Sequence, residues 1–343
     1  MMDLQRVNEY MSQVEESEKK VLPHGKRLKT GLDLGTAFIV LVVLDENDQP
    51  VACEKQAASV LRDGVVVDYS GACRIVRELK EKLEQRLGEE LIDCAIAMPA
   101  GTESSVRTHQ YVAESAGFEV TNILDEPTAA NAIYQISDGV VVDIGGGSTD
   151  IAVISMGGRV KAASLPVAGN AFDSCIAQYV QEKYQIAIGP LTAEQLKKQV
   201  ACCTRSEFEG VMEVRGHSWE TNLPARRIIY TRDLYEPVQE LAARIANAAR
   251  NVLESTPPEL AADVSGTGIL LTGGGSLLRG LAGYIAGELH TDVAIAPDPL
   301  NCVARGTAIS LSEGKYLSAG FRDATPKVWN RRLNHSHDPF TGE

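Results

Sequence analysis

The chain has 343 residues, 44% of them hydrophobic, which is enough for one large two-lobed fold or two ordinary domains with a substantial core. Its formal net charge of -13 argues against bulk binding to nucleic acid and against simple electrostatic adhesion to anionic lipid. No apolar run reaches the length of a membrane span, because the longest, at residues 37–44, has only the length of a strand.

The first segment, residues 1–28, is expected to form a leader helix outside the core. Its apolar residues Leu4, Val7, Met11 and Val14 recur at spacings of three and four, as in a short amphipathic helix. Such a helix can dock on its own protein or target a partner assembly, and docking on its own protein is favoured. At the other end, residues 315–343 are expected to form a polar, poorly ordered tail.

Strand and helix patterns alternate between these ends. In lobe I they predict a hairpin at 30–44 and 50–54, strands at 65–67, 91–98 and 120–124, and helices at 71–87, 104–116 and 127–135. In lobe II they predict strands at 139–143, 151–155, 159–164, 211–215, 227–231 and 268–272, and a helix at 233–253. The order of strand, glycine turn, strand and crossover helix occurs twice, which predicts two related α/β lobes. We place lobe I at 29–138 and lobe II at 139–314, with an outer subdomain inserted at about 200–232.

The seven cysteines are scattered along the chain, and none belongs to a Cys-x-x-Cys pair. This pattern predicts reduced, mostly buried thiols and favours a cytoplasmic protein. The adjacent Cys202 and Cys203 can be redox-active or can simply pack in the core, and packing is favoured.

Three glycine-rich turns follow three apolar strands, at residues 31–36, 142–149 and 271–276. Glycine lets the backbone approach a phosphate and present its N–H groups, and an Asp at the strand end can hold a hydrated Mg²⁺. One such turn alone is most often only a hairpin, but three together are more specific. The chain lacks both the Gly-Lys-Ser/Thr run of a P-loop and the Gly-x-Gly-x-x-Gly of dinucleotide folds. We therefore expect two opposed turns to clamp the phosphates.

The turns at Asp33 and Asp143 resemble the two phosphate motifs of the superfamily of actin, seventy-kilodalton heat-shock chaperones and sugar kinases. Residues 125–130 resemble its first connecting helix, 271–276 its adenosine motif and 303–306 its second connection. The resemblance runs from about residue 28 to residue 312. It implies an α/β actin-like ATPase fold, with two related lobes of mixed β-sheet and flanking helices around a nucleotide cleft. It also implies ATP, or ADP, and Mg²⁺ as ligands.

The resemblance further implies a role for each site residue. Asp33 and Asp143 would hold the Mg²⁺ through water, and Glu126 would orient the attacking water, so these three are the expected catalytic residues. Glu126 can alternatively be a carboxylate that favours a helix N-terminus. Glu194 and Lys197 would contact ribose and adenine, or form a solvated i,i+3 pair. The other expected nucleotide contacts are Gly35, Thr36, Ala37, Gly145, Gly146, Gly147, Ser148, Thr149, Gly273, Gly274, Gly275 and Arg279.

The two halves of the chain resemble different members of this superfamily. Residues 32 to about 146 are similar to the EutJ family of ethanolamine-utilisation clusters, as at 44–47, 62–69 and 116–120. Only about thirty residues separate Asp33 from Asp63, so the outer subdomain of lobe I is expected to be reduced, as it is in EutJ proteins. The second half resembles MreB, the bacterial rod-shape actin, at 192–194, 213–216, 257–261 and 298–306, and in the acidic Asp150.

We therefore expect a slow, Mg-dependent ATPase of EutJ type that chaperones or organises microcompartment enzymes. Its partners would then be client enzymes or shell proteins of a microcompartment. The alternative is an MreB-like cytoskeletal filament protein in cell-shape determination, which would associate with further copies of itself. A small-molecule kinase on the same fold is the third hypothesis.

Overall fold

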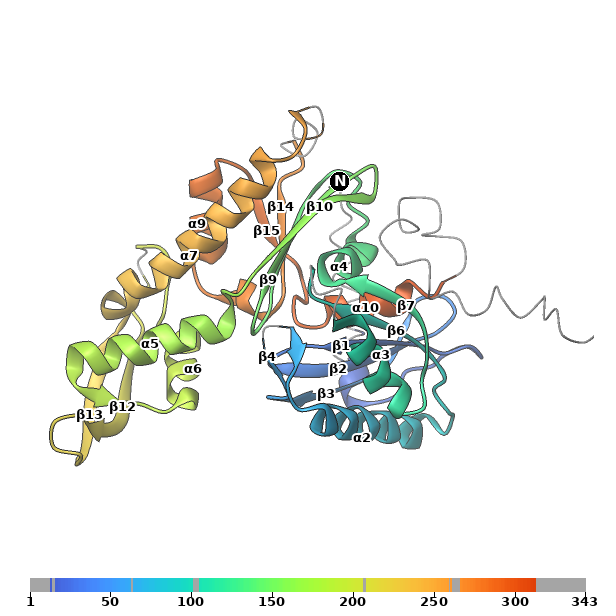
Figure 1. The fold of residues 1–343 in the computed structure, drawn as a ribbon, viewed down its shortest axis with the longest axis horizontal. Helices are drawn as coiled ribbons and strands as arrows, with labels where there is room; N and C mark the ends of the chain where they lie inside the picture. Colours follow the sequence, from blue (N-terminus) through green and yellow to red (C-terminus); the bar gives the residue numbers. More distant parts are fainter. Residues whose placement is uncertain are drawn as a thin grey trace, which may run out of the picture. The chain divides into compact units, whose positions relative to one another are not determined.

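The computed structural model describes residues 13, 16–62, 64–100, 105–205, 208–258, 260 and 266–312. They belong to two compact units. Figure 1 shows their helices and strands, coloured along the sequence. Unit 1 comprises the chain up to Ser137, residues 156–159 and the chain from Asn301; unit 2 comprises residues 138–155 and 160–300. The predicted tail at 315–343 and most of the predicted leader helix lie outside the described residues.

Unit 1 is built on a five-stranded sheet in the order β3-β2-β1-β6-β7. Its strands are β1 (Lys29–Leu34), β2 (Phe38–Leu44), β3 (Pro50–Ala57), β6 (Asp93–Met98) and β7 (Glu119–Asp125). The pairs β1–β2 and β2–β3 are antiparallel, whereas β6 runs parallel to β1 and to β7. Strand β2 is buried on both faces apart from its first residue, as its run of Ile, Val and Leu predicts.

Within the described ranges, the helices that cover this sheet are α2 (Tyr69–Leu87), α3 (Val106–Ser115), α4 (Glu126–Tyr134) and α10 (Cys302–Ile309). Apolar residues of α2 and α3 pack in one core cluster with β1 and β2, and residues of α4 and α10 pack in another with β2 and β3. Between β3 and α2 the described chain forms only the short strands β4 (Leu61–Arg62) and β5 (Val65–Val66). The outer part of this unit is therefore small, as predicted.

Unit 2 repeats the arrangement with a sheet in the order β10-β9-β8-β14-β15. The strands are β8 (Gly139–Ile144), β9 (Thr149–Ser155), β10 (Gly158–Leu165), β14 (Ile269–Thr272) and β15 (Val293–Ile295). Strand β8 is antiparallel to β9 and parallel to β14, just as β1 is antiparallel to β2 and parallel to β6. The two sheets thus have the same topology, which agrees with the repeat in the sequence.

The described part of unit 2 contains the helices α5 (Gly169–Tyr184), α6 (Pro190–Gln199), α7 (Thr231–Glu254) and α9 (Leu281–Leu289), with the 3-10 turn η2 (Gly274–Leu277). A separate sheet of β11 (Ile186–Ala187), β12 (Val211–Ser218) and β13 (Pro224–Tyr230) forms the inserted part (Figure 1). The antiparallel β12–β13 pair corresponds to the strands predicted at 211–215 and 227–231. Helix α6 begins at Pro190, since Pro is well suited to a first helical position.

Helix α10 belongs to unit 1, whereas the sequence assigned residues 139–314 to lobe II. A Cβ atom built on Gly306 would overlap the carbonyl oxygen of Ala129 in α4, and one on Gly31 would overlap that of Ala304. Two glycines therefore let α10 lie directly on β1 and α4. This contact joins segments far apart in the sequence, which local patterns do not reveal.

All seven cysteines lie in the described part of the chain, and none forms a disulfide; Cys175 alone among them is half-buried rather than buried. Burial raises the pKa of Cys203 to about 12, which leaves its thiol protonated and unreactive near neutral pH. Packing, the favoured reading of Cys203, agrees with this environment. None of the helices in the described ranges combines the length and apolar character that a membrane crossing requires.

Candidate functional site

The first glycine turn connects β1 to β2 in unit 1. Asp33 lies near the end of β1, and Asp33, Gly35, Thr36 and Ala37 are all half-buried. A Cβ atom built on Gly35 would lie 2.7 Å from the carbonyl oxygen of Phe38, so no side chain fits there. Glycine thus keeps the turn narrow, and close approach of a backbone to a phosphate favours such a residue.

Glu126 is the first residue of α4 and is 7% exposed. The helix cap is supplied by its neighbour Asp125, whose Oδ1 accepts a hydrogen bond of 3.0 Å from the backbone N–H of Thr128. The other oxygen of Asp125 pairs with Arg159 Nη1 at 2.8 Å. Because Asp125 performs the capping, the helix does not need Glu126 for that purpose.

The second glycine turn connects β8 to β9 in unit 2. The backbone N–H of Gly145 donates to the carbonyl oxygen of Ser148 at 2.9 Å and closes the turn around Gly146 and Gly147. The hydroxyl of Thr149 donates to the carbonyl oxygen of Val167 at 2.6 Å, which fixes the start of β9. These two hydrogen bonds therefore fix the shape of the turn.

Helix α5 begins directly against this second turn. The N–H of Gly169 donates to Gly145 O at 3.0 Å, and the N–H of Asn170 donates to Gly146 O at 2.8 Å. A Cβ atom on Gly169 would lie 3.3 Å from Gly145 O, so a larger residue would fit tightly there. The positive end of the α5 dipole thus adjoins the turn, which favours an anion there.

Asp143 is the last residue but one of β8, a strand that is buried along its whole length, and is 3% exposed. Thr272 Oγ1 donates to its Oδ1 at 2.6 Å, and Asp150 is its direct partner in the β8–β9 register. Burial raises the pKa of Asp143 to about 7; the nearby charge of Asp150 acts in the same direction, and the Thr272 hydrogen bond opposes it. Two carboxylates at one buried strand end fit the charge and oxygen preference of a hydrated Mg²⁺. A bound cation would favour the ionised form of Asp143.

The third glycine turn packs against the second. Gly273 has φ +76°, and a Cβ atom on it would overlap the carbonyl oxygen of Ile144. A Cβ atom on Gly275 would lie 2.5 Å from Ile144 Cγ2, and one on Gly274 would lie 2.8 Å from Leu300 Cδ2. Gly273 and Gly275 are therefore sterically reserved for glycine by the backbone of Ile144, whereas at Gly274 the end of the flexible Leu300 side chain can move. The predicted phosphate and adenosine turns of unit 2 meet at Ile144.

Glu194 and Lys197 do not form the i,i+3 pair considered as an alternative. Glu194 pairs with Lys198 at 2.6 Å, on an exposed side of α6. Lys197 instead donates to Asp173 Oδ2 and to the carbonyl oxygen of Gly169, both at 2.9 Å. Lys197 is thus connected to the start of α5 and, through Gly169, to the second turn. The sequence did not identify Asp173, because nothing local relates it to Lys197.

Arg279 is exposed, and its guanidinium lies 3.4 Å from the centroid of the Phe208 ring. Its carbonyl oxygen accepts from the N–H of Cys203 at 2.8 Å. The loop after α6 therefore packs against the segment that follows the third turn. Phe208 was also missed by the sequence analysis, since a lone aromatic residue in a polar segment gives no signal of its contact.

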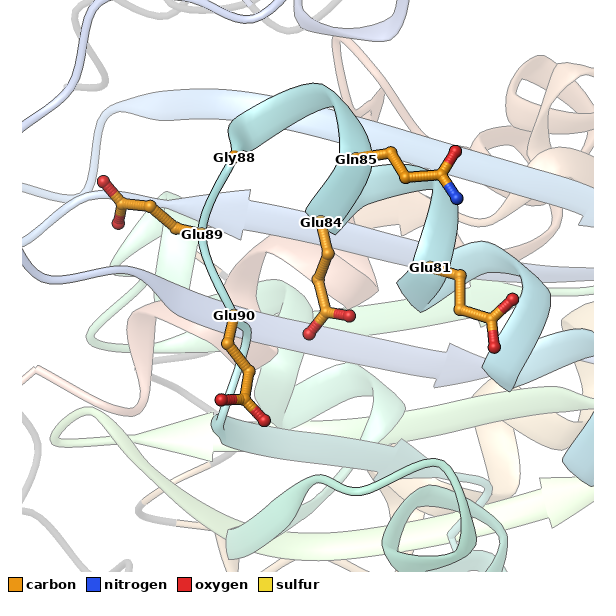
Figure 2. Close-up of a pocket in the computed structure, with 6 residues that line it drawn as sticks. All are labelled: Glu81, Glu84, Gln85, Gly88, Glu89 and Glu90. Atoms are coloured by element: carbon orange, nitrogen blue, oxygen red, sulfur yellow. The ribbon is translucent and has the colours of Figure 1, made fainter.

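The predicted residues of unit 2 thus form one contiguous region, from the second turn through α5 and α6 to the third turn. Asp33, Gly35, Thr36, Ala37 and Glu126 belong to unit 1. A pocket elsewhere in unit 1, drawn in Figure 2, contains none of the predicted site residues. It lies at the end of α2 and is lined by Glu81, Glu84, Gln85, Gly88, Glu89 and Glu90. Its carboxylates would repel the phosphates of a nucleotide.

The family model described as MreB/Mbl protein matches residues 53–319. The cell shape-determining protein Mbl of Bacillus cereus is 35% identical over 318 residues, which cover 82% of this chain and 95% of that protein.

Two solved structures share the fold. The crystal structure of MreB 5 of Spiroplasma citri bound to AMPPNP has a TM-score of 0.74 and 29% identity, covering 83% of this chain and 96% of its own. The crystal structure of the ethanolamine utilization protein EutJ from Carboxydothermus hydrogenoformans has a TM-score of 0.68 and 30% identity, covering 89% and 98%. The predicted actin-like ATPase fold is confirmed.

The main functional prediction, an EutJ-type role with microcompartment enzymes, is wrong. The likeness to Mbl extends over 82% of the chain, so it is not confined to the second half. The match to the MreB/Mbl model likewise begins at residue 53, well inside the half that was compared with EutJ. The motifs that suggested EutJ belong to a fold that both families share.

Proposed function

The chain belongs to the MreB/Mbl protein family, and we propose that it is a nucleotide-dependent cytoskeletal filament protein that acts in cell-shape determination. The observation that carries this proposal is the pair of glycine turns that meet at Ile144 beside the buried Asp143, in a chain of this family. Their steric requirements and charge suit the phosphates of a nucleotide together with a cation.

The proposed ligand is ATP or ADP with Mg²⁺. The Spiroplasma citri relative binds AMPPNP in its crystal structure, which supports a nucleotide here. In our proposal Asp33 and Asp143 hold the Mg²⁺ through water, and the N–H groups and hydroxyls of the first and second turns contact the phosphates. The third turn, with Glu194, Lys197 and Arg279, contacts ribose and adenine. When bound, the Mg²⁺ neutralises phosphate charge.

We further propose that Glu126 accepts a hydrogen bond from the attacking water and orients it during slow hydrolysis. Its position at the start of α4 is fixed by the Asp125 cap, so the carboxylate is held by a helix rather than by a loop. The proposed partners are further copies of the same chain. Their assembly would respond to the bound nucleotide, since ATP and ADP differ in the charge at the first and second turns.

Sedimentation and negative-stain electron microscopy of the full chain test this function. We expect pelletable filaments with ATP and Mg²⁺, and about tenfold or more weaker Mg-dependent ATP binding, with loss of filaments, in Asp143→Asn. Asp292→Asn makes the same chemical change at an exposed site outside the turns and serves as the control. The proposal fails if ATP binds but no polymer forms over a wide range of protein concentrations.

A further inference from the structure

Three segments of unit 2 meet at Gly169, the first residue of α5. A Cβ atom on Gly169 would lie 3.3 Å from Gly145 O, 3.5 Å from Lys197 Nζ and 3.7 Å from the Cα of Gly146. The second glycine turn, the start of α5 and the Lys197 ammonium therefore occupy neighbouring positions. Lys197 comes from α6, the helix between β11 and β12, so this helix contributes a charge to this point.

The Lys197 ammonium is largely withdrawn from solvent and has two acceptors. Its side chain is 15% exposed, and that of its ion-pair partner Asp173 is 18% exposed. Two of its three N–H groups point to Asp173 Oδ2 and Gly169 O, each at 2.9 Å. An ammonium has three donors, so among the described residues one N–H remains for a further acceptor.

Among the described residues, Lys197 is the hydrogen-bond and ion-pair partner of the Asp173 side chain. Its Oδ1 is buried and has no hydrogen-bond partner among the described residues. Burial raises the pKa of Asp173, and the hydrogen bond and charge of Lys197 oppose that shift. Removing either partner would leave the other charge poorly solvated, so each determines where the other sits.

We propose that Asp173 is a positioning residue of the nucleotide site, which holds the Lys197 ammonium at the start of α5 so that its third N–H donates to an oxygen of the bound nucleotide. This inference rests on the proposed function, since it names how one nucleotide contact is held. The carbonyl oxygen of Gly169 supplies the second anchor. Because the N–H of Gly169 bonds Gly145 O, the lysine and the second turn are held as one unit.

The role of Asp173 depends entirely on Lys197, which gives a sharp expectation for a double-mutant cycle. A residue that acts through another contributes nothing once that other residue is removed. A purely structural Asp173 would instead lower stability whether or not Lys197 is present. Substitution of Asp173 would then weaken nucleotide binding by the same factor with and without Lys197.

The experiment measures the affinity of the full chain for ATP with Mg²⁺, by calorimetry, in Asp173→Asn, Lys197→Ala and the double variant. Asp173→Asn keeps the shape and removes the charge, and we expect it to weaken binding by about three- to tenfold. The double variant should bind within about twofold of Lys197→Ala alone. In hydrolysis assays, KM for ATP should rise while kcat stays within about twofold, because the lysine is not the residue that orients water.

Glu182→Gln is the matched control, because it makes the same acid-to-amide change near the other end of α5 and should leave affinity unchanged. The inference is overturned if Asp173→Asn binds ATP as tightly as the wild type. It is also overturned if the loss of affinity in the double variant is the product of the two single losses, or if kcat falls at constant KM. These results are separable from failure of the proposed function. That failure would appear as absent ATP binding in the wild type, as unchanged binding in Asp143→Asn, or as ATP binding without polymer.

Discussion

His109, on α3, shows how burial alters a single ionisable residue. Its side chain is fully buried, Nδ1 contacts the carbonyl oxygen of Ser105 at 3.0 Å, and Nε2 has no hydrogen-bond partner among the described residues. Burial lowers its pKa, and the Ser105 contact opposes the shift only in part. As the pH falls below about 6.5, the unfolded chain therefore takes up a proton that the folded chain resists.

The free energy of unfolding should consequently decrease as the pH drops from 7.5 to 5.5, by at most about 1.4 kcal/mol per pH unit from this group. Urea denaturation of wild type and His109→Gln checks this, since Gln can keep a donor towards Ser105 but does not titrate. The wild type should lose more stability than the variant over this pH range. Parallel pH profiles would show that His109 is not responsible.

Residues whose role follows from their neighbours in sequence were predictable, and residues defined by distant contacts were not. Asp143 and Gly273 directly follow or end apolar strands, so a strand pattern and a turn suffice to find them. Asp173 meets a lysine 24 positions later in the chain, and Phe208 meets Arg279 from a different segment. Neither contact produces a periodic or compositional pattern in the sequence.

At the scale of elements, α10 depends on how closely it can approach its neighbours. Gly306 of α10 has no room for a side chain, because a Cβ atom would overlap the backbone of Ala129. Gly283 in α9 is also helical, but nothing lies within 4 Å of an added Cβ atom. The two glycines therefore form a matched pair for the same substitution.

Gly306→Ala should destabilise the protein by about 1–3 kcal/mol, because α10 must move away from α4 and β1. Gly283→Ala should be neutral or stabilise by up to about 1 kcal/mol, because alanine has the higher helix propensity. Urea denaturation of both variants provides the comparison. Equal effects of the two substitutions would mean that the α10 contact is not tightly packed.

Most elements were predictable because each carries its own pattern. The helix predicted at 127–135 begins at Glu126, since the Asp125 cap fixes its start. The placement of α10 in unit 1 was not predictable, because the reason is a backbone-to-backbone approach through Gly31 and Gly306. A single glycine in an apolar helix does not reveal which surface it faces.

For the whole molecule, the repeated sheet order explains why the fold was predicted correctly and the EutJ-type role wrongly. The motifs at Asp33, Asp143 and Gly273 specify a fold, and EutJ and MreB 5 both have that fold. Short motifs of a shared fold cannot separate its families. Likeness over 318 residues can, because it also includes the surfaces that the motifs leave out.

The net charge of -13 leads to a prediction for assembly as a whole. Copies of an acidic chain repel one another, and the repulsion extends over about 30 Å at 0.01 M salt but only about 10 Å at 0.1 M. At fixed ATP and Mg²⁺, the pelleted fraction should therefore rise as NaCl increases from 10 to 100 mM. ATP affinity measured at both salt concentrations separates assembly from nucleotide binding. Less polymer at higher salt, with ATP affinity unchanged, would mean that attractive ion pairs dominate the contact between copies.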